Sequence, residues 1–147
     1  SGNLSRCPNM QEFHFMSDLN KSGLLQNKKI IINGQTGDFI TGGHIPTNFI
    51  DSVPTRENFI NFIIEKHYSL WTNLKNKENI NMIKLNIENF LNQHNDKFNF
   101  KNPYPYLYNL WEWKERQSKF VISQQKIYDF YNIKWELPLW DLEFMNF

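Results

Sequence analysis

The sequence has 147 residues, of which 40% are hydrophobic and 16% aromatic, and it carries a formal net charge of +1. This length and apolar content are enough for one core, so we expect a single domain over residues 1–147 and little disorder. The small net charge gives no electrostatic reason to expect a nucleic-acid or anionic-membrane partner. Since Cys7 is the sole cysteine, an intrachain disulfide and a cysteine-rich metal site are excluded.

Targeting features are also missing from the sequence. No apolar run approaches the length of a membrane span, and residues 1–8 lack the basic and apolar regions of a signal peptide. We therefore expect a cytoplasmic protein with no membrane span. Cys7 as a catalytic nucleophile has little support, because nothing nearby suggests a base.

The first third of the chain predicts a helix, a strand and a glycine-rich loop. A helical pattern covers residues 9–25, and Ser22-Gly23 supplies a stop signal. The β-branched run at residues 28–33 predicts a buried strand. It leads directly into residues 34–43, which we call the glycine loop, and residues 44–53 then look irregular.

The rest of the chain predicts helices. Residues 54–71 and 79–94 each place their apolar side chains on one face, and residues 95–105 form a loop between helices. Residues 106–131 predict one long helix or two abutting ones, and residues 135–141 a turn before a short final helix. The expected fold is mainly α with a small α/β remnant, in which one buried strand leads into the glycine loop and a helical bundle follows.

A single buried strand is incomplete by itself, because such a strand needs neighbours on both edges. Either a weak strand elsewhere in the sequence has been overlooked, or the remaining strands lie outside this chain. The absence of stop signals around residues 144–147 leads us to expect that the chain is part of a longer protein.

The glycine loop is the strongest candidate for chemistry. Backbone amides after a strand can converge on an anion, and Gly34 and Gly37 allow close approach to a phosphate. Asp38 could hold Mg²⁺ against phosphate oxygens. The loop matches neither common nucleotide-binding fingerprint, so a turn-rich connector is an equal reading of the residues by themselves.

Two blocks of sequence resemble asparagine synthetases. The first, Asn33-Gly34-Gln35-Thr36-Gly37-Asp38 followed by Phe39-Ile40-Thr41-Gly42-Gly43-His44, is similar to the family's Ser-Gly-Glu-Gly-(Ser/Gly)-Asp-Glu loop and the Gly-Gly-aromatic that follows it. The second, Glu115-Arg116 followed by Leu137-Pro138-Leu139-Trp140-Asp141, resembles its Asp-Arg segment and later Arg-x-Pro-Phe-Leu-Asp. The blocks occur in the family's order, and the resemblance spans residues 9–147. It looks most like the asparagine-synthase-related proteins found with bacterial surface-polysaccharide genes.

The resemblance implies the C-terminal part of a synthetase domain with an adenine-nucleotide α-hydrolase-like fold. The family uses ATP and Mg²⁺ to adenylate a carboxylate, releases pyrophosphate, and lets an amine attack to form an amide and AMP. Asp38 then lies near Mg²⁺ and pyrophosphate, Gln35 faces the acyl substrate, and Gly34, Thr36, Gly37 and Arg116 contact the nucleotide. Arg116 contacting phosphate and Arg116 clamping Asp141 remain open alternatives.

Several family features are absent from this sequence. It lacks the pyrophosphate-binding Ser-Gly-Gly-x-Asp-Ser loop and the glutaminase domain, and the family's catalytic lysine falls beyond Phe147. We therefore expect about half a site, completed by the remainder of the parent synthetase domain, a small carboxylate substrate and a nitrogen donor. The alternative is a non-catalytic helical interaction module that retains the glycine loop.

Other candidate sites are favoured less than packing or surface roles. The histidines at positions 14, 44, 67 and 94 lack zinc-ligand spacing. The carboxylate pairs Glu112/Glu115 and Asp141/Glu143 could act as acid and base but fit a helix surface better. Trp111 and Trp113 could form a sugar or base platform, with core packing as the alternative.

Gln35 gives an expectation about the substrate. A glutamine lacks the charge with which the family's glutamate pairs with the ammonium of aspartate, and it offers two N–H donors instead. We expect a carboxylate without a free α-ammonium, such as a sugar acid of surface-polysaccharide synthesis, unless a nearby carboxylate replaces the missing charge.

Overall fold

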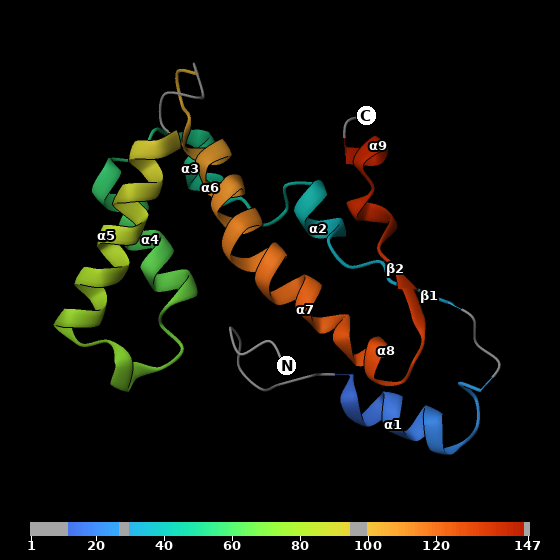
Figure 1. The fold of residues 1–147 in the computed structure, drawn as a ribbon. Coiled ribbons are helices and arrows are strands. Elements are labelled where there is room, and N and C mark those ends of the chain that lie inside the picture. Colours follow the sequence, from blue (N-terminus) through green and yellow to red (C-terminus); the bar gives the residue numbers. More distant parts are fainter. Residues whose placement is uncertain (1–11, 27–29, 95–99, 146–147) are drawn as a thin grey trace. The chain divides into compact units, whose positions relative to one another are not determined.

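The computed structural model describes residues 12–26, 30–94 and 100–145, which are mostly helical (Figure 1). The sequence predicted no internal boundary, but the residues group into two compact units. Unit 1 comprises Ser1–His44 and Trp111–Phe147, and unit 2 comprises Ile45–Leu110. Residues 33–44, 115–116 and 137–141, the two sequence blocks described above, all belong to unit 1.

Unit 1 begins with the predicted helix, α1 (Phe13–Lys21). Gly23 follows with φ +77°, a left-handed conformation that commonly ends helices because glycine adopts it without strain. The predicted stop signal is thus confirmed. The part of the prediction at residues 9–11 lies outside the described residues.

The predicted strand is β1 (Ile30–Ile32), and it pairs in parallel with a second strand, β2 (Lys134–Glu136). The two strands lie side by side (Figure 1). Ile31 is paired with Trp135. β2 was missed because its sequence, Lys-Trp-Glu, lacks an apolar run, and we expected a turn there. The sequence left open whether a partner strand had been overlooked or lies outside this chain. The first alternative holds for β2.

The prediction that β1 is buried was wrong. Ile30 and Ile32 are 41% and 67% exposed, and only the intervening Ile31 packs against the core of unit 1. A two-stranded sheet alternates its side chains between two faces. In the described residues, the core of unit 1 covers the Ile31 face, so the other two isoleucines remain open.

Where the sequence predicted one long helix or two abutting ones over residues 106–131, the structure has a run of four helical segments. A π-helical segment occupies nine residues of it, and π-helical geometry is rare and frequently found at functional sites. The segments are α6 (Tyr104–Glu112), the π-helical η3 (Trp113–Val121), α7 (Ile122–Gln124) and α8 (Lys126–Phe130). After β2, unit 1 ends with the 3₁₀ turn η4 (Pro138–Trp140) and α9 (Leu142–Met145).

The core of unit 1 joins residues distant in sequence. Side chains from α1, α8 and the segments that precede the two strands are buried together, and the sheet packs on them through Ile31 and Trp135. The buried members are Met16, Leu25, Ile127, Tyr128 and Ile133. This packing places the end of β1 close to α7 and α8.

Unit 2 is helical in the residues described. Its segments are α3 (Thr47–Asp51), which the sequence did not predict, α4 (Arg56–His67), η1 (Thr72–Leu74), α5 (Lys77–His94) and most of α6. Thr55 caps α4 by accepting a hydrogen bond from the backbone N–H of Asn58 at 3.2 Å. Phe49, Phe59 and Tyr108 form its aromatic core.

Among the helices that the structure describes, none has both the length and the apolar character needed to cross a membrane.

Candidate functional site at the end of strand β1

The loop that leaves β1 starts with a local turn built by Asn33. Its backbone N–H donates to the carbonyl of Glu136 at 3.0 Å, which extends the pairing with β2 by one residue. Its side-chain Oδ1 accepts from the backbone N–H of Gln35 at 2.9 Å. Asparagine favours such turns because its side chain can replace a backbone acceptor two residues away.

Thr36 is held in a strained backbone conformation. Its φ is +84°, a left-handed value unusual for a β-branched residue, which costs roughly 1–3 kcal/mol. The surroundings hold it there: Thr36 Oγ1 accepts from Trp140 Nε1 at 2.7 Å and donates to Gln117 Oε1 at 3.3 Å. Thr36 is also only 4% exposed, so its hydroxyl forms hydrogen bonds within the protein.

Gln35 and Asn33 contact a buried glutamine on the helical run. Gln125, which is 0% exposed, donates from Nε2 to Gln35 Oε1 at 2.7 Å. Its Oε1 accepts from Asn33 Nδ2 at 3.3 Å, and Asn33 Nδ2 also donates to the Tyr128 hydroxyl at 3.2 Å. Asn33, Gln35 and Thr36 are therefore held by side chains more than 80 residues away.

Gly37 and Asp38 open the short helix α2 (Gly37–Ile40). Asp38 is exposed, and no described residue donates a hydrogen bond to its carboxylate. Its backbone carbonyl accepts from Gly43 N at 3.0 Å and from Thr41 Oγ1 at 3.2 Å, which folds the end of the glycine loop back on α2. The Asp38 carboxylate therefore faces solvent from a fixed backbone.

The two glycines differ in their surroundings. A Cβ added to Gly34 would meet no described atom within 4 Å, whereas one added to Gly37 would lie 3.6 Å from Leu139 Cδ1. The chain is thus open at Gly34, where a ligand could approach the backbone, and packed at Gly37 against the second sequence block.

Aromatic side chains support the loop from one side. Phe39 stacks on His44 with ring centroids 4.8 Å apart and contacts Trp113 at 5.6 Å. Trp113 in turn lies 4.2 Å from Trp140. These rings pack against each other, which agrees with the packing alternative for Trp113.

Arg116 lies on η3 and is partly buried. In the described part of the chain, no hydrogen bond or ion pair joins it to the glycine loop or to Asp141. The Asp141 carboxylate accepts instead from the backbone N–H groups of Glu143 and Phe144, at 2.9 and 3.1 Å, and so caps α9. The clamp between Arg116 and Asp141 is thus not formed here.

Two of the alternative carboxylates are also occupied. Glu115 forms an ion pair with Lys119 one helical turn away. Glu112 is 1% exposed, which places it in the packed part of the helix. The Glu112/Glu115 pair therefore does not offer two carboxylates facing a common open space.

The donors present fit part of a Mg²⁺–phosphate group. Mg²⁺ typically takes one or two carboxylates together with substrate phosphates, and the loop supplies Asp38 and an open backbone at Gly34. Within the described ranges, no cluster of three or more histidine, cysteine, aspartate or glutamate side chains could hold a metal ion. A magnesium ion at this loop would therefore depend on phosphate oxygens for most of its ligands.

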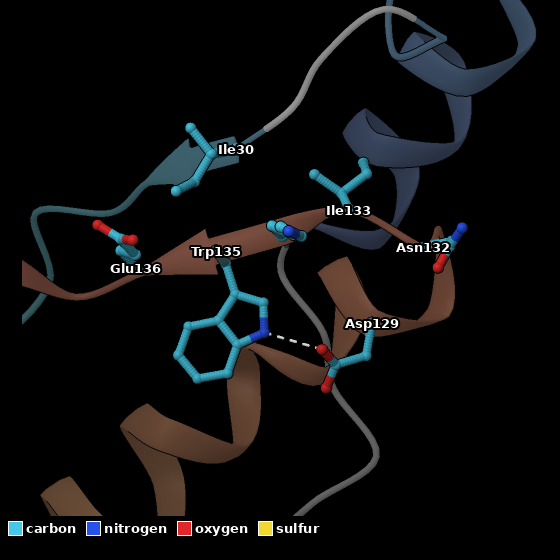
Figure 2. A pocket seen from close by; sticks show the side chains of 7 residues that line it. Ile30, Asp129, Asn132, Ile133, Trp135 and Glu136 are labelled. Atoms are coloured by element: carbon cyan, nitrogen blue, oxygen red, sulfur yellow. Dashed lines mark hydrogen bonds between the residues drawn. The ribbon is translucent and has the colours of Figure 1, made fainter.

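A pocket of about 490 Å³ lies beside the sheet and away from the loop. Trp135 Nε1 donates to Asp129 Oδ1 in this pocket at 2.8 Å. Figure 2 shows this hydrogen bond together with the lining residues Ile30, Ile133 and Glu136. None of the predicted site residues lines it. In parallel sheets ligands bind beyond the carboxyl ends of the strands, and for that reason we place the candidate site at the loop.

The residues that position the loop were not predicted from the sequence. They are Gln117, Gln125, Tyr128 and Glu12. A signal for two of them was present: Gln117, Val121 and Gln125 recur at intervals of four on one helical face. Uncharged polar residues in an apolar stripe indicate buried hydrogen bonds, because a buried polar group without a partner is costly.

Comparisons with known proteins add nothing to this geometry. No protein-family model matches the chain, and no curated protein or solved structure resembles it significantly.

Proposed function

We propose that this chain is part of an ATP-dependent amide-forming enzyme that resembles asparagine synthetase. The reaction class is adenylation of a carboxylate, release of pyrophosphate, and attack of an amine to give an amide and AMP. The remainder of the synthetase domain would supply the missing phosphate loop and lysine, and the enzyme would work in the cytoplasm.

One observation carries the proposal: the two sequence blocks that resemble the family contact each other at the loop. Trp140 of the second block donates to Thr36 of the first at 2.7 Å. Leu139 of the second block lies against Gly37, and Asn33 pairs with Glu136, the residue immediately before Leu137. Residues about 100 positions apart are expected to meet in this way if both blocks build one site.

The position of the loop supports a phosphate-binding role. It follows the carboxyl end of a strand in a parallel sheet, where α/β proteins commonly bind their ligands. Its backbone is open at Gly34, and strain at Thr36 is held by buried hydrogen bonds. Strained backbone that the surroundings maintain is often found at ligand-binding positions.

The roles within the site follow from what each residue can do. Asp38 offers an exposed charge suited to Mg²⁺ and departing pyrophosphate, and the backbone of Gly34, Thr36 and Gly37 suits phosphate oxygens. Such catalysis is mainly positioning and neutralisation of charge. Bound Mg²⁺ would supply that neutralisation at the phosphates, and Gln35 would contact the carboxylate substrate.

A second function is favoured by one feature of unit 2. Leu70 is 81% exposed and Trp71 55%, and both line a pocket of about 320 Å³ together with Met82 and Ile83. Exposed apolar side chains around a pocket are typical of interaction surfaces. A non-catalytic helical module that binds another protein through this surface is therefore the alternative.

The test is an assay of the full-length protein for ATP-dependent formation of AMP and pyrophosphate, with ammonia or glutamine as nitrogen donor and a panel of carboxylic acids. Turnover that depends on one of the acids supports the proposal. Failure to form AMP with any acid, combined with loss of protein binding in Leu70→Glu, would favour the interaction module.

A further inference from the structure

A chain of hydrogen bonds runs from Glu12 to the glycine loop, and its direction is fixed at the first step. An ionised carboxylate only accepts, so the Tyr128 hydroxyl must donate to Glu12 Oε2, which lies 2.6 Å away. The Tyr128 oxygen is then left to accept, and it lies 3.2 Å from Asn33 Nδ2. The Asn33 amide therefore points its nitrogen toward Tyr128.

A backbone contact fixes Asn33 independently. Its Oδ1 lies 2.9 Å from the backbone N–H of Gln35, which can only donate. The oxygen of Asn33 thus faces Gln35 N, and its nitrogen faces Tyr128 and Gln125. Two unrelated partners, the Tyr128 hydroxyl and the backbone N–H of Gln35, therefore require the same orientation of the Asn33 amide.

Gln125 links the Asn33 amide to the Gln35 amide, so the orientation of Asn33 determines that of Gln125. Its Oε1 accepts from Asn33 Nδ2 at 3.3 Å, and its Nε2 donates to the backbone carbonyl of Val121, which can only accept, at 3.2 Å. The same Nε2 lies 2.7 Å from Gln35 Oε1. Since Gln125 is fully buried, rotating its amide by half a turn is costly. Its oxygen would then face two acceptors, Gln35 Oε1 and the Val121 carbonyl, and its nitrogen would face the donor Asn33 Nδ2.

The orientation of Gln35 follows. Its Oε1 is held by Gln125, so its NH₂ group points to the other side, and no described residue accepts a hydrogen bond from it. Gln35 is partly exposed. The loop therefore presents two N–H donors, and no side-chain acceptor, at this position.

We propose that Gln125 is a positioning residue that holds the Gln35 amide with its donors outward, so that the site selects a ligand group with anionic oxygens and disfavours an ammonium. Gln125 touches no ligand itself. The inference rests on the proposed function only in that the loop binds a ligand. A carboxylate and a phosphate share the required chemistry and are separated by the test.

The first experiment is NMR of the full-length protein with ¹⁵N-labelled glutamine and asparagine side chains. We expect slow exchange of the Gln125 NH₂ protons and fast exchange of those of Gln35. Addition of succinate or of magnesium pyrophosphate, in separate titrations, should shift the Gln35 NH₂ signals. A shift with succinate only identifies a carboxylate as the ligand group, and one with pyrophosphate only identifies a phosphate.

The second experiment is the variant Gln125→Glu followed as a function of pH. Burial raises the pKa of a glutamic acid above its ordinary value of about 4.3. Below that pKa the protonated acid still donates to Gln35. Above it the carboxylate only accepts, so Gln35 must turn its NH₂ inward. Its exchange should then slow by roughly tenfold relative to wild type at the same pH, which corresponds to about 1.4 kcal/mol.

Tyr128, which shares the hydrogen-bond partner Asn33 with Gln125, does not titrate in the same range. Burial together with the bond to Glu12 raises the pKa of Tyr128 to about 12. Gln124→Glu, at the adjacent and less buried position, is the matched control and should leave Gln35 exchange unchanged.

The outcomes that overturn the proposal are specific. Slow exchange of Gln35 NH₂ and fast exchange of Gln125 NH₂ in the wild type would show that Gln35 donates to Gln125, the opposite of the proposed direction. This measurement on the wild type is decisive even if Gln125→Glu does not fold. No shift of Gln35 with either probe would overturn the ligand selection. Lack of AMP formation in the full-length protein counts against the proposed function instead, because the exchange measurement needs no turnover.

Discussion

The indole N–H of Trp140 donates to Oγ1 of Thr36 at 2.7 Å, across 104 positions of sequence. The Thr36 hydroxyl in turn donates a hydrogen bond to Gln117 Oε1 at 3.3 Å. A single hydroxyl therefore joins the loop after β1, the turn after β2 and the π-helical segment. It also holds a threonine in a left-handed conformation that its side chain disfavours.

Thr36→Val should destabilise the protein by about 1–3 kcal/mol, because it leaves the half-buried Trp140 donor and the buried Gln117 acceptor without this partner. Trp140→Phe should cost less, about 1 kcal/mol, since the ring can still pack on Trp113. Urea unfolding measures both. Trp135→Phe loses a solvent-exposed hydrogen bond and keeps an aromatic ring against the core, so it should have the smallest effect. An equal loss in all three variants would argue against the special role of Thr36.

The stability of the protein should fall at high pH because of Tyr128. Burial and the hydrogen bond to Glu12 raise the pKa of Tyr128 to about 12 in the folded state, compared with about 10 when unfolded. Its contribution is thus fully present below pH 10 and is lost as the pH rises through about 12.

Tyr128→Phe removes this dependence and should cost about 1 kcal/mol at neutral pH through its lost hydrogen bonds. Unfolding free energy measured between pH 9 and 12 provides the check. Tyr131→Phe should keep the wild-type slope. A Tyr128→Phe protein with the unchanged slope would show that another group causes it.

Gly34→Ala should separate stability from activity. The added Cβ meets no described atom within 4 Å and the backbone φ at Gly34 is not left-handed, so stability should change by less than about 1 kcal/mol. A ligand that approaches the backbone at this point would meet the methyl group, and turnover in the full-length enzyme should fall roughly tenfold to a hundredfold.

Gly43→Ala, whose Cβ would make only ordinary contacts, controls for stiffening of the loop. If both alanine variants keep wild-type turnover, the phosphate does not lie against Gly34.

Asp38→Asn should leave the fold intact, because no described residue donates to the Asp38 carboxylate. In the full-length enzyme it should abolish turnover, a loss of roughly a hundredfold or more, since its charge is needed where pyrophosphate leaves. Thermal unfolding and pyrophosphate release measure the two effects. Pyrophosphate release by Asp38→Asn near the wild-type rate would show that Asp38 is not part of the site.

Gln35 predicts the substrate. A neutral amide loses a charge-assisted hydrogen bond to an ammonium, typically worth about 1.5–3 kcal/mol, so selection of aspartate should be weakened roughly tenfold or more. We expect the full-length enzyme to turn over uronic-acid sugar nucleotides in preference to aspartate, measured as ATP-to-AMP conversion. Efficient formation of asparagine, without turnover of the sugar acids, would contradict this expectation.

Local sequence determined much of the secondary structure. Helical periodicity predicted α4 and α5 to within a few residues, and Gly23 ended α1 where expected because few other residues adopt its φ easily. The β-branched run placed β1 and the loop after it. These features depend on neighbouring residues, so they could be read from the chain in order.

The tertiary structure decided the second strand and the surroundings of the loop. Lys-Trp-Glu is a strand only because it pairs with β1, and the short helix α3 and the division into two units had no local signal. The candidate loop was predictable from its residues, but the orientation of Gln35 was not. It is set by Gln125 across 90 positions of sequence, and a hydrogen bond between distant residues exists only once packing has brought them together.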